Sequence, residues 1–263
     1  MLTSCLCTEK SLLSKPMLEW AERLKEAPGH LHRKVWEWCF ISQALAERGM
    51  LISGKRGLGF AVGQEPLTAA FANLGAQITA TDLFADDAAA SGWIKSRQHA
   101  SGFKAINSRQ LCVPAKLETL VRFEFLDMNK LGNKFDNQYD FVWSSCALEH
   151  LGNLEKGLQF IANAMQCLKP GGFAVHTTEF NVSSNSTTVE TGETVLYRRQ
   201  DIERLVGQLH ALGHTVDFDW TPGDGRGDQI IDVPPYKHDV HLKLVIGEHT
   251  VTSLGLIIQK ARL

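Results

Sequence analysis

The sequence predicts an α/β fold built on a mostly parallel sheet, and three observations carry this prediction. Residues 57–82 contain a strand, a glycine-rich turn, a helix and a second strand in succession. Short apolar, strand-like runs then recur at 120–126, 139–145 and 173–180, separated by helical or polar stretches. A length of 263 residues suits one large α/β domain, or one domain with additions.

Within this pattern, residues 57–82 give the clearest indication of a ligand-binding site. The turn contains Gly57, Gly59 and Gly63, the helix covers 65–73 and stops at Gly75, and the strand 77–81 ends on Asp82. Glycines after a first strand let the backbone approach a ligand, and an acid after the second strand can accept both hydroxyls of a ribose. We therefore expect a cofactor that contains a nucleoside.

The glycine spacing separates two kinds of cofactor. A dinucleotide site needs G-x-G-x-x-G, and counting from Gly57 and Gly59 the third position is Val62, which disfavours NAD. The spacing Gly59, Ala61, Gly63 instead resembles the G-x-G-x-G loop of class I S-adenosylmethionine-dependent methyltransferases, with alanine for the middle glycine. Further matches follow in the family's order up to residue 178: FEFLD at 123–127, YDFVWSS at 139–145, EHL at 149–151 and LKPGG at 168–172.

The resemblance implies a Rossmann-like class I methyltransferase fold with S-adenosylmethionine as cofactor. It implies a seven-stranded, mostly parallel sheet with an antiparallel edge strand and helices on both faces. The last two strands, 214–220 and 251–260, would form the antiparallel pair at that edge. The cofactor-binding residues it indicates are Gly59, Phe60, Ala61, Gly63, Asp82, Leu83, Asp127, Met128, Ser144 and Ser145.

Asp127 and Gly57 each leave a question open. Asp127 would lie beside the adenine, although an acid at a strand end also caps turns. The family usually carries an acid two residues before the first loop glycine, where this chain has Gly57. The methionine ammonium of the cofactor must then be held by a backbone carbonyl or by a residue of the N-terminal helix.

The rest of the chain supplies the surroundings of the site. Residues 1–50 are predicted to be a helical segment, divided at Pro28-Gly29, that packs on a methyltransferase domain of residues 51–263. Its apolar face indicates packing, but Arg33, Lys34 or Trp36 could instead close over the carboxylate end of the cofactor.

Helices are expected at 85–97, 154–168 and 199–212. The polar loop 181–194 reads as a substrate rim or lid, and 221–250 as an insertion on the substrate side.

Transfer of a methyl group to a hydroxyl requires close positioning and a base. His150 is the first catalytic candidate, with Glu149 to orient it, unless the two merely cap the following loop; Glu179 is the second candidate. Asp232, Tyr236, His238 and His241 are candidates for acceptor contacts. No metal site is predicted, because two histidines and an acid in a flexible loop are usually solvated.

Composition narrows the acceptor. A formal net charge of −2 gives no electrostatic footprint for nucleic acid, so a small-molecule or glycan acceptor is favoured. The six cysteines form no C-x-x-C pair, which indicates neither a zinc site nor a disulfide framework and favours a cytoplasmic setting. No run approaches the roughly 18 apolar residues of a membrane span, and no secretory signal is recognised.

The sequence thus favours a methyltransferase that O-methylates a sugar hydroxyl or a similar small metabolite. GLGFAVGQEPL, HRKVWEW and HLKL more loosely resemble methyltransferases of bacterial polysaccharide and glycan biosynthesis. The alternative is a non-catalytic member of the fold that acts as a partner or scaffold, which Gly57 and Ala61 support because both depart from the pattern. The oligomeric state stays open.

Overall fold

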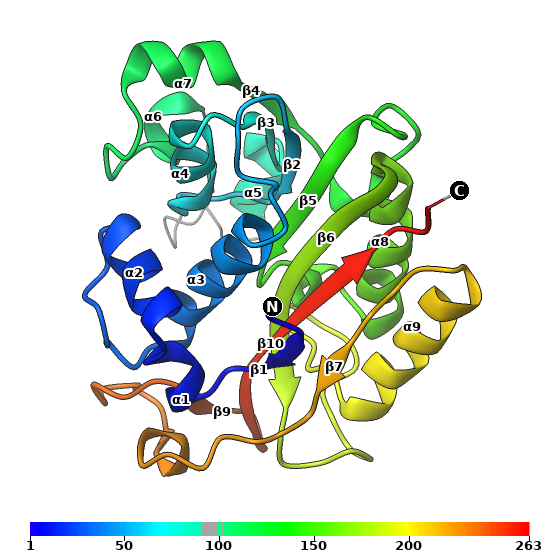
Figure 1. Ribbon diagram of the computed structural model, residues 1–263. Helices are drawn as coiled ribbons and strands as arrows, with labels where there is room; N and C mark the ends of the chain where they lie inside the picture. The colour runs from blue at the N-terminus through cyan, green and yellow to red at the C-terminus, as the bar shows by residue number, and fades with distance from the viewer. Residues whose placement is uncertain (91–98, 101, 263) are drawn as a thin grey trace.

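The computed structural model describes residues 1–90, 99–100 and 102–262, and its centre is one mixed sheet (Figure 1). Within these residues the sheet has ten strands, in the order β4-β3-β2-β5-β6-β10-β1-β7, with β8 and β9 attached through β10. The strands are β1 (Ser4–Leu6), β2 (Arg56–Phe60), β3 (Gln77–Asp82), β4 (Val121–Phe125), β5 (Tyr139–Ser145), β6 (Leu168–Asn181), β7 (Phe218–Asp219), β8 (Ile231–Asp232), β9 (Lys243–Ile246) and β10 (His249–Gln259).

The half of the sheet that follows the glycine-rich turn is parallel, as the sequence predicted. Strands β4, β3, β2, β5 and β6 pair in parallel, whereas β10 runs antiparallel to β6 from Val251↔Asn181 to Gln259↔Phe173. The carboxyl ends of the parallel strands therefore lie at one edge, where open α/β sheets bind their ligands.

The predicted fold class is confirmed, but the strand count and the edge differ. The last strand, β10, is interior because β1 pairs with it antiparallel, at Cys5↔Gly255, and β7 pairs with β1. Three residues near the chain start carry too little periodicity to reveal a strand. The predicted strand 214–220 shrinks to Phe218–Asp219, with a single bridge from Thr215 to Gln259.

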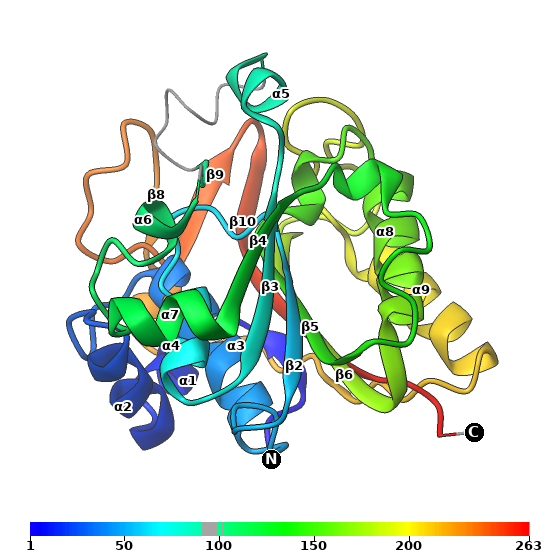
Figure 2. The same cartoon turned by 90° about the horizontal axis from the view of Figure 1, so that it is seen from above.

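Helices cover both faces of the sheet (Figure 2). One face carries α2 (Lys15–Arg23), α3 (Arg33–Ala46), α4 (Leu67–Asn73) and α7 (Pro114–Leu120), and the other carries α8 (Leu154–Cys167) and α9 (Arg199–Ala211). The shorter helices are α1 (Glu9–Leu12), α5 (Ala85–Ala90), α6 (Phe103–Ile106), η1 (Met128–Lys130), η2 (Leu148–His150) and η3 (Gly227–Gln229). The helix expected at 85–97 is present to Ala90, and its remainder lies outside the described residues.

Aromatic side chains fill the core on both faces. On the α3 side, fully buried Trp36 stacks on Phe40 with ring centroids 4.8 Å apart, and Phe71 meets Trp143 edge-on at 5.2 Å. Each such side chain stabilises the fold by about 1.5–3 kcal/mol through burial. The Nε1–H of Trp36 donates to Ser11 Oγ, so this tryptophan belongs to the core and does not reach over a cofactor. In the described part of the chain, no helix is both long and apolar enough to cross a bilayer.

Asp140 joins the start of β5 to two neighbouring strands and gives a pH-dependent prediction. It accepts the backbone N–H of Arg56 at 2.9 Å and the Lys169 ammonium at 3.0 Å. Burial alone would raise its pKa, but these donors and Lys55 hold the pKa of Asp140 below its ordinary 3.8. The ionised carboxylate therefore stabilises the fold above about pH 4, and this contribution is lost as the pH falls through the lowered pKa.

We expect Asp140→Asn to lower the free energy of unfolding by about 1 kcal/mol at pH 7, measured by urea denaturation. The gap between variant and parent should narrow as the pH is lowered below about 4. A gap that stays constant over that range would contradict the assignment.

Candidate active site

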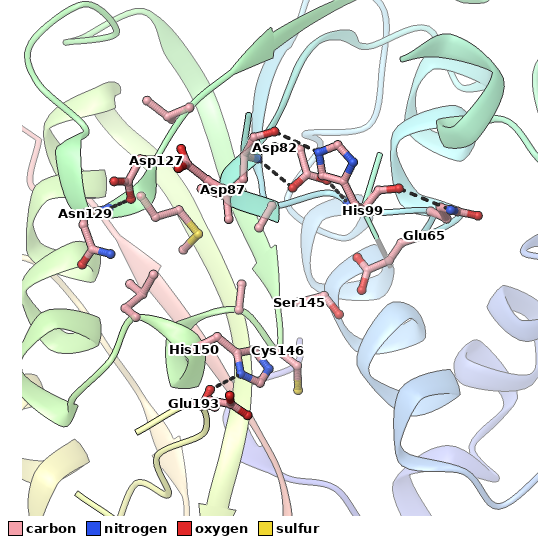
Figure 3. Close-up of a pocket in the computed structure, with 18 of the residues that line it drawn as sticks. Glu65, Asp82, Asp87, His99, Asp127, Asn129, Ser145, Cys146, His150 and Glu193 are labelled. Carbon is pink, nitrogen blue, oxygen red and sulfur yellow. Dashed lines mark hydrogen bonds between the residues drawn. The ribbon is translucent and has the colours of Figure 1, made fainter. Parts of the chain in front are cut away.

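A cavity of about 950 Å³ opens at the carboxyl ends of β2, β3, β4 and β5 (Figure 3). Its walls come from the loop after β2, the ends of β3 and β4, the turn after β5, helix α3 and the loop that follows β6. Of the ten residues predicted to bind cofactor, those that line it are Ala61, Gly63, Asp82, Leu83, Asp127, Met128 and Ser145.

The loop after β2 owes its shape to two residues with left-handed backbone. Ala61 has φ 46° and Gly63 φ 52°, a region that costs a residue with a side chain about 1–2 kcal/mol. The N–H of Gly63 donates to Asp82 Oδ2 at 3.1 Å. The turn therefore presents its backbone to the cavity and is fastened to the end of the neighbouring strand.

Asp82 holds several pieces of the wall together. Besides Gly63, its carboxylate accepts the N–H groups of Ala100 and Leu83, each at 2.8 Å. Burial raises the pKa of Asp82, and the three backbone donors oppose that rise. A carboxylate has about four lone-pair sites, so Asp82 shapes the cavity with three and retains acceptor capacity for a ligand.

The sequence left open whether Asp127 caps a turn or lies at the cofactor site, and the structure shows that it caps a turn and also lines the cavity. Its Oδ1 accepts the N–H of Asn129 at 2.9 Å and so caps η1, while Oδ2 pairs with Lys130 at 3.1 Å. Asp127 also lines the cavity (Figure 3). Its neighbour Met128 is another lining residue. The contact of Asp127 with adenine stays a prediction.

Gly59, Phe60 and Ser144 do not line the cavity and serve packing instead. A Cβ on Gly59 would lie 2.4 Å from the Trp143 ring, and Phe60 packs edge-on against Phe160 at 4.9 Å. Ser144 Oγ lies 2.8 Å from His176 Nδ1, inside the sheet. Side chains alternate along a strand, so Ser144 and Ser145 point to opposite faces and only Ser145 reaches the cavity.

At Gly57, where the family usually has an acid, the space for a side chain is filled by the ring of Phe141. A Cβ on Gly57 would lie 2.3 Å from Phe141 Cζ, so no carboxylate can occupy this place without displacing Phe141. The cavity instead receives a carboxylate from Glu65, just beyond the glycine turn, and an ammonium from Lys34 on α3. The sequence predicted Glu65 as the first residue of a helix and not as a site residue. Its position two residues after Gly63 is the feature of the sequence that could have indicated a role at the cavity.

Of the three predicted catalytic residues, the structure places only His150 at the cavity. His150 lines the cavity, and its Nδ1 lies 2.7 Å from the backbone oxygen of Glu193. Glu149 and Glu179 are 0% and 4% exposed and do not line the cavity. Glu149 Oε2 accepts from Thr178 Oγ1 at 2.9 Å, and Glu179 pairs with Arg33 at 2.5 Å.

The polar loop between β6 and α9 reaches the cavity, as expected of a rim. Gly192 and Glu193 line it, and the N–H of Gly192 donates to Gly152 O at 3.1 Å. The candidates in the insertion lie elsewhere. Asp232 pairs with His241 at 2.6 Å, and His241 stacks on His32 with ring centroids 4.7 Å apart. None of the four candidates, Asp232, Tyr236, His238 and His241, lines the cavity.

Restoring the family's acid at Gly57 provides a test of the ring packing. We expect Gly57→Asp and Gly57→Ala both to destabilise the protein, by about 1–3 kcal/mol or more, because Phe141 must move. Thermal unfolding measures the loss. Gly49→Ala is a control for the loss of glycine, since no atom lies within 4 Å of a Cβ there, although its φ of 69° adds strain. Unchanged stability of Gly57→Ala would refute the packing account.

Comparisons with known proteins agree with this geometry. Residues 58–176 match the family model described as a methyltransferase domain. No curated protein matches the sequence at a significant level.

Three solved structures illustrate the likeness in fold. An S-adenosylmethionine-dependent methyltransferase from Methanosarcina mazei has TM-score 0.51 and 12% identity, over 83% of this chain and 98% of that one. The 1,6-didemethyltoxoflavin-N1-methyltransferase of Burkholderia thailandensis, solved with S-adenosylhomocysteine, has TM-score 0.50 and 16% identity, over 84% and 76%. The [4+2]-cyclase SpnF has TM-score 0.51 and 17% identity, over 85% and 81%.

At such identities the structural likeness shows the fold alone, and the cyclase illustrates that one fold hosts different reactions. The family match covers the segment that carries the glycine turn, Asp82 and β5. Residues 58–176 are similar to a methyltransferase domain, and the chain shares its fold with solved S-adenosylmethionine-dependent methyltransferases.

Proposed function

We propose that the protein transfers the methyl group of S-adenosylmethionine to a hydroxyl oxygen of a sugar or a similar small metabolite. The observation that carries this proposal is that His150 faces the same cavity as Ala61, Gly63 and Asp82. A potential base and the predicted cofactor wall are therefore in one space of about 950 Å³.

The cofactor would lie with its adenosine between Asp82 and Asp127 and its methionine end toward α3. There Glu65 would accept the ammonium and Lys34 would pair with the carboxylate. Burial raises the pKa of Glu65 to about 7, and the Lys34 ammonium opposes that rise. A bound ammonium would favour the ionised form of Glu65 in the same way. In this arrangement the segment 1–50 serves the methyltransferase domain of residues 51–263: its helix α3 contributes to the site, and its strand β1 joins the sheet of that domain.

The cofactor, when bound, supplies an electrophilic methyl on its sulfonium. Nδ1–H of His150 donates to the Glu193 carbonyl, so a neutral ring carries its lone pair on Nε2. The hydroxyl of the acceptor would give its proton to Nε2 while the oxygen attacks the methyl carbon in line. In this transfer an oxygen–carbon bond would form as the sulfur–carbon bond of the cofactor breaks, with S-adenosylhomocysteine as the second product.

A sugar acceptor is supported by the polar groups around His150 and by the looser likeness of the sequence to glycan methyltransferases. Ser145, Asn129 and Glu193 all line the cavity and can form hydrogen bonds with hydroxyls. A cytoplasmic setting is supported by the six cysteines, all of which are free thiols.

The alternative, a non-catalytic scaffold of the same fold, has weaker support. It rests on Gly57 and Ala61, and both are accounted for by local structure. Phe141 fills the space beside Gly57, and Ala61 adopts the left-handed conformation that a glycine would have.

Glu65→Gln tests the methionine end of the cofactor site. We expect affinity for S-adenosylmethionine to fall about tenfold, equivalent to about 1.4 kcal/mol, since a charged hydrogen bond becomes a neutral one. Affinity should also weaken in the parent as the pH falls through about 7, because Glu65 then takes up a proton. Isothermal titration calorimetry measures both effects.

Adenosine is the matched control ligand, because it lacks the methionine part. Its affinity should be equal in the parent and in Glu65→Gln. Equal weakening for adenosine and S-adenosylmethionine would mean that Glu65 only supports the loop, and the assignment would fail.

His150→Gln tests the base. We expect kcat to fall about 10²–10⁴-fold, while the affinity for S-adenosylhomocysteine stays the same. Transfer of isotope-labelled methyl to a panel of nucleotide sugars and free oligosaccharides measures the rate. His249→Gln is the control, because His249 begins β10 and does not line the cavity. A fully active His150→Gln would remove His150 from the mechanism.

A further inference from the structure

Beside the cavity, three potential metal ligands converge from three elements. Cys146 follows β5, Glu149 lies in η2 and Glu179 lies near the end of β6. One ligand atom from each can be chosen so that all three lie within 4.8 Å of one another. All three residues are buried, at 8%, 0% and 4% exposed, and Cys146 also lines the cavity.

Each glutamate in this group has one oxygen bonded to the protein and one oxygen bare. Glu149 Oε2 accepts from Thr178 Oγ1, and Glu179 Oε1 pairs with Arg33. Among the described residues, neither Glu149 Oε1 nor Glu179 Oε2 has a hydrogen-bond donor. A buried acceptor without a partner costs about 1–3 kcal/mol, and more when charged. Two such oxygens beside one thiol indicate a missing positive partner.

The charges around the cluster point the same way. When ionised, the carboxylates of Glu37, Glu149 and Glu179 face two cations. Arg33 pairs with Glu37 at 3.3 Å and Lys34 pairs with Glu37 at 3.0 Å. This buried group is therefore one positive charge short. A divalent cation that displaces the thiol proton of Cys146 supplies that single charge.

We propose that Cys146, Glu149 and Glu179 bind a zinc ion. Zinc accepts thiolate sulfur together with carboxylate oxygen, and its catalytic sites in proteins have three protein ligands and one open position. Because Cys146 lines the cavity, the open position would face it. Thr178 and Arg33, each bonded to the other oxygen of a ligand carboxylate, would hold the ligands in place from outside.

The role of this ion rests on the function proposed above. At the open position it would bind the acceptor hydroxyl and make its proton more acidic. That proton would pass to His150, the oxygen would take the methyl group, and S-adenosylhomocysteine would leave. Binding of the ion itself releases the Cys146 proton to solvent and needs no oxidant or reductant.

The test is titration of the metal-free protein with zinc chloride in competition with a chromophoric chelator, without S-adenosylmethionine. We expect one tight equivalent. Thr178→Val, which removes an outer contact, should weaken the affinity for zinc by about 10–100-fold. Cys146→Ser and Glu149→Gln, which each remove a ligand, should weaken that affinity further. Cobalt chloride should give a thiolate charge-transfer band in the near ultraviolet that Cys146→Ser abolishes.

Two variants are matched controls. Cys167→Ser removes another buried thiol, at the end of α8, and His241→Ala removes the histidine paired with Asp232. Both should retain the tight site. The proposal is overturned if the parent shows no thiolate band with cobalt, or if His241→Ala abolishes zinc binding while Cys146→Ser keeps it.

The two proposals can fail separately. Absence of the zinc site with normal binding of S-adenosylmethionine would remove the metal alone. The cobalt spectrum of the parent protein decides the matter even if Cys146→Ser and Glu149→Gln do not fold.

Discussion

The close pairing of β2 with β5 is the constraint on which the rest of this structure depends. Gly57 lies opposite Phe141 and Gly59 opposite Trp143, and each glycine leaves room for the aromatic ring of its partner. A side chain at either glycine would come within 2.4 Å of a ring atom. The strand that leads into the glycine-rich loop therefore cannot carry an acid on this face. The cavity takes its carboxylate from Glu65, at the far end of the loop.

The loop itself is positioned by Asp82. Three backbone N–H groups, from Gly63, Leu83 and Ala100, converge on one carboxylate, and this joins the turn after β2 to the segment after β3. The same carboxylate is the predicted ribose acceptor. Substitution of Asp82 would therefore disturb the cavity wall and the predicted ligand contact together. Glu65→Gln is isosteric and lies at the other end of the proposed cofactor site, so it distinguishes an effect on binding from an effect on folding more clearly.

The buried charges behind Cys146 connect the N-terminal helix to the sheet. Arg33 on α3 pairs with Glu179 on β6 and with Glu37 one turn along its own helix. Buried ion pairs recover their desolvation cost poorly, so they are weak evidence for stability. Among the described residues, two carboxylate oxygens of this group also have no hydrogen-bond donor, and the zinc ion proposed above would be a partner for both. The fold class does not supply this conclusion, since the same scaffold hosts a cyclase.

The sequence by itself determined the fold class and much of the cavity wall, and it predicted the cofactor. The reason is that Gly63, Asp82 and Asp127 lie at or just after the carboxyl ends of parallel strands, and these ends meet at one edge of the sheet. The tertiary structure alone decided which neighbours face the cavity. Ser144 and Ser145 differ only in strand face, and Glu149 and His150 only in the turn of a short helix.

Long-range contacts decided the rest. Strand β1 pairs with residues some 250 positions away. The proposed zinc ligands, Cys146, Glu149 and Glu179, meet only because β5 and β6 lie side by side. The spacing of cysteines along the chain indicated no zinc site. That spacing cannot reveal a group such as Cys146, Glu149 and Glu179, which has one cysteine and whose members come from different elements. Local patterns report the period of a strand or helix, whereas these groupings depend on which strands become neighbours.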